Sequence, residues 1–287
     1  MMTDVQRKAY PGLLYTDPTF QPDQSAGFLL NIFLNESQLI FSIINQETKY
    51  LLHLQSYNFF QFNNQAEFYS IIRDLSDKED LFNLSFKTTN FYLYNGYNTL
   101  IPSELFDADY LSHYFQFNFD TNTPFYYAYD VLEKQGIVNV YGIPIELKKI
   151  FEDKFKSPIF YHNSTPLIEY LCKTETEHEA VYIYIQPHWM QIMVNQNRTP
   201  IFFNSFHYAT PEDFIYYILY TYQQLKLDPE TIPVFLLGEI VKDSVLFEHL
   251  YKYIRHVNMM KRPEELQIQK TFNMPGHFYY NIFCAGL

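Results

Sequence analysis

The sequence predicts a two-lobed α/β protein in which one strand-rich unit, followed by helices, occurs twice. Short apolar strands joined by polar turns precede amphipathic helices near residue 28, and the same order restarts near residue 180. An ordered series of elements that recurs at matching spacings indicates a duplicated structural unit. The chain of 287 residues is 47% hydrophobic, which is enough apolar surface to bury two ordinary cores. We therefore expect two lobes, each a mixed sheet with an antiparallel three-strand meander flanked by helices.

The expected domain organisation follows from where each copy begins. We expect an N-terminal extension over residues 1–25, a first lobe over 26–175 and a second lobe over 176–287. The acidic run Thr174–Glu179 marks the boundary between the lobes, because a run of like charges favours solvated chain.

The first copy opens with three strands that polar turns connect. They are expected over residues 28–34, 38–44 and 49–57. Asn64 with Glu67 three residues later is the pattern of a helix N-terminus, and an apolar stripe with helical spacing follows. A further strand is expected over 90–94.

The stretch between the copies reads as a hairpin followed by helices. The two hairpin strands are expected over 125–132 and 137–141, with Gly136 in the turn. Pro144 is expected to open a helix, and a strand over 158–161 precedes another helix over 165–171.

The second copy repeats the three-strand meander. Its strands are expected over residues 181–185, 189–194 and 201–205. Thr210-Pro211 is typical of a helix start, because Thr caps the helix and Pro suits its first turn. A strand over 233–237 and a helix over 244–253 follow. The strings Ser103–Phe106 and Ser244–Phe247 are expected at equivalent positions of the two copies.

The charge of the chain argues against a nucleic-acid partner. The formal net charge is −12, whereas a nucleic-acid binder clusters Lys and Arg to neutralise phosphates. The nearest approach to such a cluster is the set Lys252, Arg255, Lys261 and Arg262.

Cysteine usage and hydropathy favour a cytoplasmic protein. Cys172 and Cys284 lie far apart, outside any CxxC spacing, and are expected to be small buried hydrophobic residues in a reducing compartment. Residues 1–23 lack the apolar segment of a signal peptide, and no apolar run has the length of a membrane span. We therefore expect no membrane insertion.

The order of elements resembles the actin-like ATPase superfamily, which shares its core with ribonuclease H. The stretch Asn204–Glu239 resembles most closely a bacterial family of this superfamily that has no assigned function. A more distant similarity is to the actin-like proteins of type IV pilus assembly, because the strand end at Tyr94-Asn95-Gly96 leads to a Pro-containing segment over 101–105.

The resemblance implies three nucleotide-binding segments, and in this chain all three are degraded. Active superfamily members carry an acidic residue and glycines in the turn after the first strand of each copy, and a Gly pair on the adenosine side. Here the first turn, Leu34–Gln38, has one acid and no Gly, and the second, Gln186–Trp189, has neither. Leu237-Gly238-Glu239 keeps one Gly of the pair. The sequence therefore predicts no catalytic residue, no metal site and no cofactor.

Four residues remain as candidates for binding a ligand in a cleft between the lobes. They are Glu36, His188, Gly238 and Glu239. Each also has a purely structural interpretation. Glu36 is either a metal ligand or a solvated turn carboxylate. His188, with Trp189 and His178, either brackets a binding site or has a structural role. Glu239 either accepts a basic group of a partner or is solvated.

Two functions fit these observations. The first is a non-catalytic actin-like protein that acts as a protein-binding or scaffold module for an unknown partner. The second is a nucleotide- or phosphometabolite-binding protein with degenerate phosphate loops. The oligomeric state is left open.

Overall fold

The chain forms two compact units. The structure is a computed structural model, and it describes residues 9–60, 62–174 and 179–287. Unit 1 contains the chain up to Thr165 with the segments Glu264–Asn273 and Ala285–Leu287, and unit 2 contains Pro166–Pro263 with Met274–Cys284. The lobe boundaries expected from the sequence stay a prediction.

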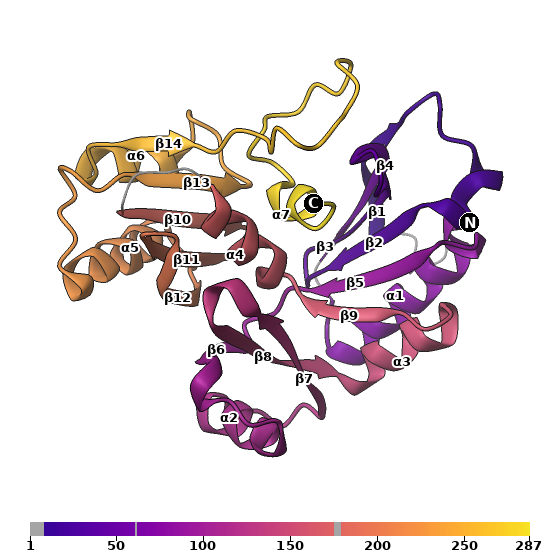
Figure 1. Cartoon of the computed structure of the whole chain (residues 1–287), viewed down its shortest axis with the longest axis horizontal. Coiled ribbons are helices and arrows are strands. Elements are labelled where there is room, and N and C mark those ends of the chain that lie inside the picture. Colours follow the sequence, from indigo (N-terminus) through magenta and orange to yellow (C-terminus); the bar gives the residue numbers. More distant parts are fainter. Residues whose placement is uncertain (1–8, 61, 175–178) are drawn as a thin grey trace. The chain divides into compact units, whose positions relative to one another are not determined.

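Unit 1 is built on a six-stranded mixed sheet, sheet A, in the order β1-β4-β3-β2-β5-β9 (Figure 1). Its strands are β1 (Ala9–Thr16), β2 (Leu29–Leu34), β3 (Gln38–Asn45), β4 (Tyr50–Phe59), β5 (Thr88–Leu93) and β9 (Ile159–His162). The strands β2, β3 and β4 form the expected antiparallel meander, β5 runs parallel to β2, and β9 runs parallel to β5.

Two helices cover one face of sheet A, α1 (Gln65–Lys78) and α3 (Ile145–Lys154) (Figure 1). Alternate strand residues such as Ile32 and Phe41 meet Ile72 and Phe151 there, all fully buried or nearly so. The cap of α1 is as expected: the Asn64 side chain accepts a hydrogen bond from the Glu67 amide at 2.9 Å.

Strand β1 is an element that the sequence pattern did not predict. It falls within the expected N-terminal extension and pairs with β4 through a bulge between Pro11 and Leu14. Pro11 and Gly12 make this segment look unlike a strand in the sequence, because both residue types are rare inside sheets. An edge strand such as β1 tolerates them. Gly12 allows a close approach, since a Cβ there would lie 2.5 Å from the Ser56 hydroxyl.

A second, smaller sheet of unit 1, sheet B, has the order β6-β8-β7. Its strands are β6 (Asn98–Pro102), β7 (Phe125–Leu132) and β8 (Ile137–Pro144), and α2 (Leu111–Asn118) packs against it. The hairpin of β7 and β8 was expected, with Gly136 in the left-handed region at its turn; β6 and α2 were not.

The expected equivalence of the strings Ser103–Phe106 and Ser244–Phe247 is wrong. Ser103 begins a short 3-10 helix after β6 of the inserted sheet B, whereas Ser244 caps α6 (Val245–Tyr253) in unit 2. Four more 3-10 helices of the described residues lie in unit 1, over Pro22–Gly27, Asp80–Asn83, Ala108–Tyr110 and Glu133–Gln135.

Unit 2 is built on a five-stranded sheet, sheet C, in the order β12-β11-β10-β13-β14. The strands are β10 (Glu179–Gln186), β11 (Trp189–Gln196), β12 (Thr199–His207), β13 (Val234–Gly238) and β14 (Val257–Met259). The helices are α4 (Ser164–Lys173), which starts at the end of unit 1, α5 (Pro211–Leu225), α6 and α7 (Tyr280–Cys284). Apolar side chains of α5 and α6 cover one face of the sheet.

The two sheets confirm the predicted duplication. The order β4-β3-β2-β5-β9 of sheet A repeats as β12-β11-β10-β13-β14 in sheet C, with the same parallel and antiparallel pairings. Each copy is thus a meander whose first strand pairs with a later parallel strand.

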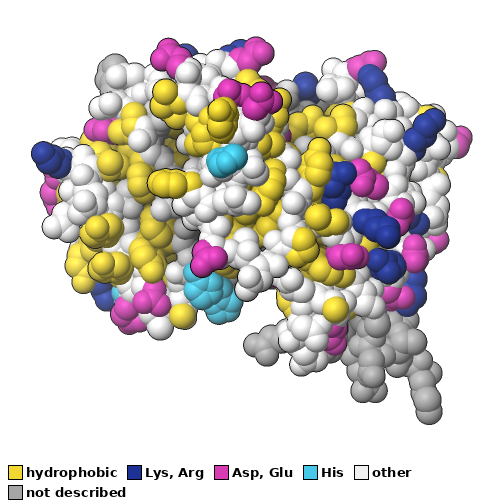
Figure 2. All heavy atoms as spheres, turned by 90° about the horizontal axis from the view of Figure 1, so that it is seen from below, with side chains coloured by type: hydrophobic (Ala, Val, Ile, Leu, Met, Phe, Trp, Pro, Cys, Tyr) yellow, Lys and Arg dark blue, Asp and Glu magenta, His cyan; other side chains and the backbone are white. Residues whose placement is uncertain are grey.

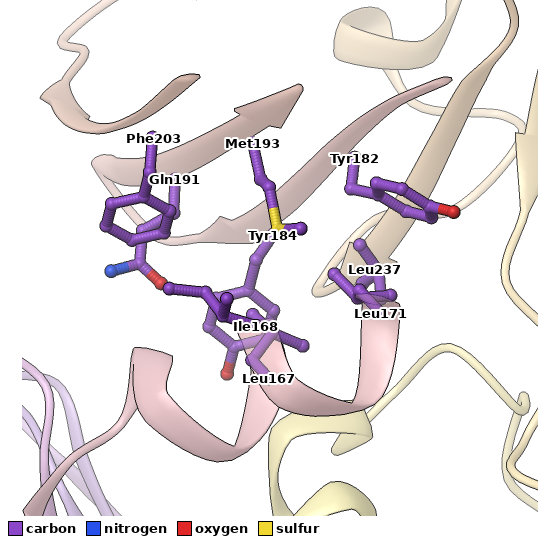
Figure 3. A pocket seen from close by; sticks show the side chains of 9 residues that line it. All are labelled: Leu167, Ile168, Leu171, Tyr182, Tyr184, Gln191, Met193, Phe203 and Leu237. Carbon is purple, nitrogen blue, oxygen red and sulfur yellow. The ribbon is translucent and has the colours of Figure 1, made fainter. Parts of the chain in front are cut away.

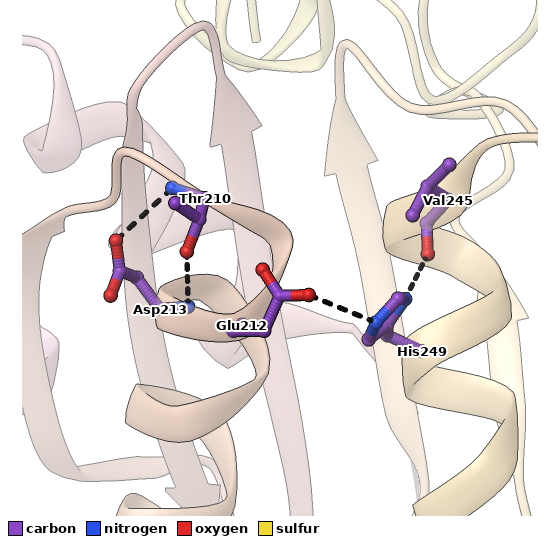
Figure 4. Close-up of polar contacts among 5 residues, drawn as sticks. All are labelled: Thr210, Glu212, Asp213, Val245 and His249. Carbon is purple, nitrogen blue, oxygen red and sulfur yellow. Dashed lines mark hydrogen bonds and ion pairs between the residues drawn. The ribbon is translucent and has the colours of Figure 1, made fainter.

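Helix α5 begins with the cap that the sequence predicts. The Thr210 hydroxyl accepts a hydrogen bond from the Asp213 amide, and the Asp213 carboxylate accepts one from the Thr210 amide, both at 3.1 Å (Figure 4). In the same turn of α5, Glu212 Oε1 lies 4.0 Å from Nε2 of His249 on α6. The other ring nitrogen, His249 Nδ1, lies 2.7 Å from the Val245 carbonyl oxygen. The pair connects the exposed sides of α5 and α6.

Candidate functional site

The turn between β2 and β3 is closed by its own side chain. The carboxamide oxygen of Asn35 accepts hydrogen bonds from the Ser37 amide at 2.7 Å, the Ser37 hydroxyl at 2.8 Å and the Gln38 amide at 2.7 Å. The Asn35 amide donates in turn to the Gln38 carbonyl. Three of the backbone donors that a phosphate-binding turn would aim at its ligand are therefore used within the turn, while the side chain of Glu36 is exposed.

The turn between β10 and β11 is a two-residue hairpin. Gln186 pairs with Trp189, Pro187 has no amide hydrogen, and His188 has a φ of 63°. Tyr208 fixes this turn from the end of β12, because its amide donates to the His188 carbonyl and its hydroxyl to the Gln186 carbonyl, at 2.9 and 2.6 Å. Burial, together with the charge of Glu239, raises the pKa of Tyr208 to about 12, so it stays a neutral donor.

Gly238 serves the packing of the sheet rather than an open loop. Its φ of 85° lies in the left-handed region, and a Cβ would lie 2.1 Å from the Ile185 carbonyl oxygen of β10. Its amide donates to the carbonyl of His277 at 2.8 Å, and the Glu239 amide donates to Ile185 at 2.8 Å.

The segment around His277 covers the end of β13. The sequence pattern does not predict this contact. His277 is buried, and its Nε2 lies 2.8 Å from the Ile240 carbonyl oxygen. Its carbonyl and ring thus engage the residues on both sides of Glu239. No local pattern could reveal this contact, because about forty residues separate the partners in the sequence.

The four candidate residues fall into two groups. His188, Gly238 and Glu239 lie at the same end of sheet C, where β10 and β13 end side by side, whereas Glu36 belongs to unit 1. Their common cleft stays a prediction, and His178 lies outside the described residues. Over residues 9–60, 62–174 and 179–287, no group of three or more His, Cys, Asp or Glu side chains could hold a metal ion.

A buried polar network in unit 1 contains the residue types of a catalytic triad. His162 Nδ1 lies 2.7 Å from the Ser164 hydroxyl, and its Nε2 lies 3.1 Å from the Asn95 carbonyl oxygen. The Asp130 carboxylate does not contact the ring; it accepts hydrogen bonds from the His162 amide, the Thr165 hydroxyl and the Tyr141 hydroxyl.

This network is structural. His162 and Ser164 are 0% exposed, so no substrate reaches them, and burial lowers the pKa of His162 to about 4. Asp130 of β7 holds the amide of β9 and thereby ties sheet B to sheet A. Because its members come from separate strands and loops, no local sequence pattern predicts this network.

Asp17 is a second buried carboxylate without a catalytic arrangement. Burial alone would raise its pKa, but hydrogen bonds from the Thr19 amide and hydroxyl and from the hydroxyls of Tyr50 and Tyr15 outweigh burial and hold the pKa below its usual value. The charge is satisfied locally, so Asp17 anchors the loop after β1.

The free cysteines and one member of the basic cluster, Arg262, have structural roles. Cys172 and Cys284 are buried, as expected, and burial raises the pKa of the Cys172 thiol to about 12, so it is no nucleophile. The Arg262 guanidinium donates to the Met274 carbonyl and lies 5.6 Å from the centre of the Phe283 ring. That side chain of the basic cluster therefore packs within unit 2.

A small apolar pocket lies in unit 2 between α4 and the face of sheet C opposite α5 (Figure 3). Its lining residues are Leu167, Ile168, Leu171, Tyr182, Tyr184, Gln191, Met193, Phe203 and Leu237. All are buried except Phe203, a half-buried residue of β12. Gln191 donates to the Ser205 hydroxyl at 3.2 Å, and its buried Oε1 has no hydrogen-bond partner.

Large hydrophobic side chains are exposed on both units. In unit 1 they include Phe117 of α2, which is 91% exposed, and Tyr129 and Val131 of β7. In unit 2, Tyr216 and Tyr220 stack on the outer side of α5 with ring centres 5.8 Å apart. Figure 2 shows hydrophobic side chains gathered toward the left of the face in view, with few Lys and Arg side chains among them. None of the described helices is long and apolar enough to cross a membrane.

Comparison with solved structures identifies the fold. A Bacteroides thetaiotaomicron protein with an actin-like ATPase fold and unknown function is 24% identical, with a TM-score of 0.77 over 84% of this chain and 94% of that one. The PilM-PilN type IV pilus biogenesis complex contains a chain that is 13% identical, with a TM-score of 0.54 over 90% of this chain and 97% of that one. The chain therefore has the actin-like ATPase fold, as the resemblance implied.

The family follows from the sequence itself. No curated protein matches the chain. The sequence profile of one family, described as a protein of unknown function (DUF3822), matches residues 17–257, which span the meanders of both units. The chain therefore belongs to the DUF3822 family.

Proposed function

We propose that this chain is a non-catalytic, cytoplasmic member of the actin-like fold that works by binding a protein partner. The observation that carries the proposal is that the donors of the former nucleotide turns are bonded inside the chain. Asn35 closes the first turn, Tyr208 holds the second, and the His277 carbonyl accepts the Gly238 amide. A phosphate that entered would have to break these bonds before it could form its own.

The surface supports binding of protein. Exposed aromatic side chains such as Phe117, Tyr129 and Tyr216 supply contact area of the kind that is enriched at interfaces. The chain is also similar in fold to one in the PilM-PilN complex, which is an assembly of proteins. That likeness favours a partner-binding role and says nothing of the partner's identity.

The test uses the full chain as an immobilised bait in a lysate of its own organism, with and without Mg·ATP. We expect one protein to be enriched in near-stoichiometric amount, equally in both conditions. The purified partner should then bind the purified chain in isothermal titration calorimetry.

Two results would contradict the proposal. One is the recovery of no reproducible partner that rebinds after purification. The other is hydrolysis of ATP by the purified chain.

The exposed side chains provide matched variants for this experiment. Phe117→Ser and Tyr129→Ser remove exposed rings of unit 1, and Tyr216→Ser removes one from unit 2. Phe117 and Tyr216 are more than half exposed, so Phe117→Ser and Tyr216→Ser should each change the free energy of unfolding by less than about 0.5 kcal/mol, whereas Tyr129→Ser, at a residue that is 42% exposed and packs against Phe106, should cost about 1 kcal/mol. If all three variants bind the partner with the affinity of the wild-type chain, the partner does not use these aromatic surfaces.

A further inference from the structure

Helix α2, which lies beside sheet B (Figure 1), leaves a large apolar side chain in solvent although its inner side is already packed. Phe115 is 1% exposed, and its ring centre lies 5.1 Å from that of Phe125 and 4.9 Å from that of Tyr127. Phe117, two residues later, is 91% exposed. Phe117 therefore contributes little to the packing of α2 on its own sheet, and its burial by another molecule would be favourable.

The segment that precedes α2 extends this apolar face. Leu105 and Tyr110 are 70% and 55% exposed. Tyr114 holds the segment against the helix, because its hydroxyl donates to the Leu105 carbonyl oxygen at 2.8 Å and accepts a hydrogen bond from the Asp107 amide at 3.0 Å. About two helical turns separate Tyr110 from Phe117, so both lie on one side of α2. We call Leu105, Tyr110 and Phe117 the α2 surface.

The α2 surface belongs to a stretch of the chain without Lys or Arg. Between Lys87 and Lys134 the chain has six acidic residues and neither Lys nor Arg. Among the residues that the structure describes, no Lys or Arg forms an ion pair with the five exposed carboxylates of this stretch. They are Glu104, Asp107, Asp109, Asp120 and Glu133. An apolar face flanked by unpaired negative charge favours a partner with apolar side chains next to Lys or Arg.

The rings exposed on unit 2 have a different charge environment. Tyr216 and Tyr220 of α5 are 59% and 46% exposed, and Tyr251 of α6 is 67% exposed. The first turn of α5 is acidic, whereas Lys226 caps its end and Lys252 follows Tyr251 on α6. Both signs of charge accompany these rings, so they do not favour a partner of one charge. They provide a comparison surface for the test.

We propose that the α2 surface receives a basic segment of a partner protein. Large apolar side chains of the segment cover Phe117 and Leu105, and its Lys or Arg side chains face the neighbouring carboxylates. A second copy of the chain is a poorer occupant because its net charge is also −12, and the same carboxylates repel nucleic acid. The proposal rests on the proposed protein-binding function and names its surface and the chemistry of its partner.

The test measures fluorescence anisotropy of a labelled amphipathic peptide, Lys-Leu-Leu-Lys-Lys-Leu-Leu-Lys-Lys-Leu-Leu-Lys, with the full chain. We expect saturable binding that weakens about tenfold as the salt rises from about 0.1 M to about 0.5 M, because salt screens exposed charges. Peptides with Glu in place of Lys, or Ser in place of Leu, should each bind at least about tenfold more weakly. Equal binding of the Glu peptide, or no saturable binding of the Lys peptide, would overturn the proposal.

Substitutions of exposed rings locate the site. Phe117→Ser should weaken binding of the Lys peptide about tenfold, because it removes the most exposed apolar side chain of the α2 surface. Tyr216→Ser, which removes an exposed ring of unit 2, should leave the affinity unchanged. Equal weakening by both variants would show that the peptide binds exposed rings in general, and the α2 surface would be wrong.

Substitutions of exposed acids test the role of charge. Glu104→Gln combined with Asp109→Asn should weaken binding about fivefold at low salt. Asp243→Asn combined with Glu248→Gln removes the same number of exposed charges from unit 2 and should change binding by less than about twofold. Equal effects of the two pairs would attribute the attraction to the overall net charge and contradict a site at α2.

Failure of this proposal is distinguishable from failure of the proposed function. If the partner captured by the wild-type chain binds Phe117→Ser with unchanged affinity, the partner docks elsewhere, but the protein-binding function stands. If the purified chain alone sediments as a dimer that Phe117→Ser dissociates, the occupant is a second copy, and the proposal of a basic segment is wrong.

Discussion

At the scale of single residues, glycine and buried histidine show how function and packing can be told apart. Gly238 is the residue that the family resemblance marks as a nucleotide contact, yet its conformation is required by the carbonyl of Ile185. His162 has the neighbours of a catalytic base, yet its ring is fully buried. In both cases the surroundings, and not the residue type, decide the role.

Replacing Gly238 should separate backbone strain from steric clash. We expect Gly238→Ala to lower the free energy of unfolding by about 3 kcal/mol, because it combines an unfavourable φ with a Cβ 2.1 Å from the Ile185 oxygen. Gly136→Ala has a similar φ of 65° but open space around it, so about 1 kcal/mol is expected. Urea unfolding measures the free energy of unfolding of both variants. Equal losses in the two variants would show that the structure relieves the clash between the new Cβ and the Ile185 oxygen.

The buried histidines predict an acid-sensitive fold. Burial lowers the pKa of His162 and of His53 from 6.5 to about 4. Between these values the unfolded chain binds more protons than the folded chain, so stability falls as the pH drops from 6.5 to 4. For His162 alone the loss is about 3 kcal/mol over this window, at 1.36 kcal/mol for each pKa unit.

Unfolding in urea at pH 7 and pH 5 checks this dependence. His162→Gln should reduce the difference between the two pH values, whereas the same change at exposed His113 should preserve it. An unchanged difference in His162→Gln would contradict the assignment.

At the scale of the elements, hairpin turns determine which backbone donors remain available. In the β2–β3 turn, backbone amides donate hydrogen bonds to the Asn35 side chain. The β10–β11 turn has only two residues, which are too few to form a loop around a ligand. Both meanders keep the strands of the actin-like fold while their turns are closed. The strands of the fold and the free backbone donors of its turns can therefore be kept or lost independently.

The Asn35 side chain should be worth more to stability than its exposed neighbour. Asn35→Ala removes an acceptor of three hydrogen bonds and should cost about 1–2 kcal/mol of unfolding free energy. Glu36→Ala, in the same turn, should change stability by less than about 0.5 kcal/mol because the side chain is exposed. Thermal or urea unfolding compares the two; a costly Glu36→Ala would indicate a role for this carboxylate that the turn does not explain.

At the scale of the whole molecule, the sequence was sufficient for the repeated architecture. Apolar alternation in residues such as Ile32 and Ile183, and the caps at Asn64 and Thr210, are local signals, and all lie where the pattern predicts. The sequence pattern does not predict the inserted strand β6 or the edge strand β1, because each contains a proline, Pro102 or Pro11, which is uncommon in strands. Contacts such as His277 with Ile240 could not be predicted, since they arise only after the chain has folded.

The central claim is that the nucleotide-binding turns of this actin-like fold are closed by the chain's own groups. Thermal unfolding of the purified chain in Mg·ATP and Mg·ADP tests it most directly, since a ligand at one hundred times its Kd stabilises the folded state by about 2.7 kcal/mol. We predict no shift in Tm with either nucleotide at millimolar concentration, for wild type and for Asn35→Ala alike. A concentration-dependent rise in the Tm of the wild-type chain would contradict the claim and favour a nucleotide-binding protein with unusual turns.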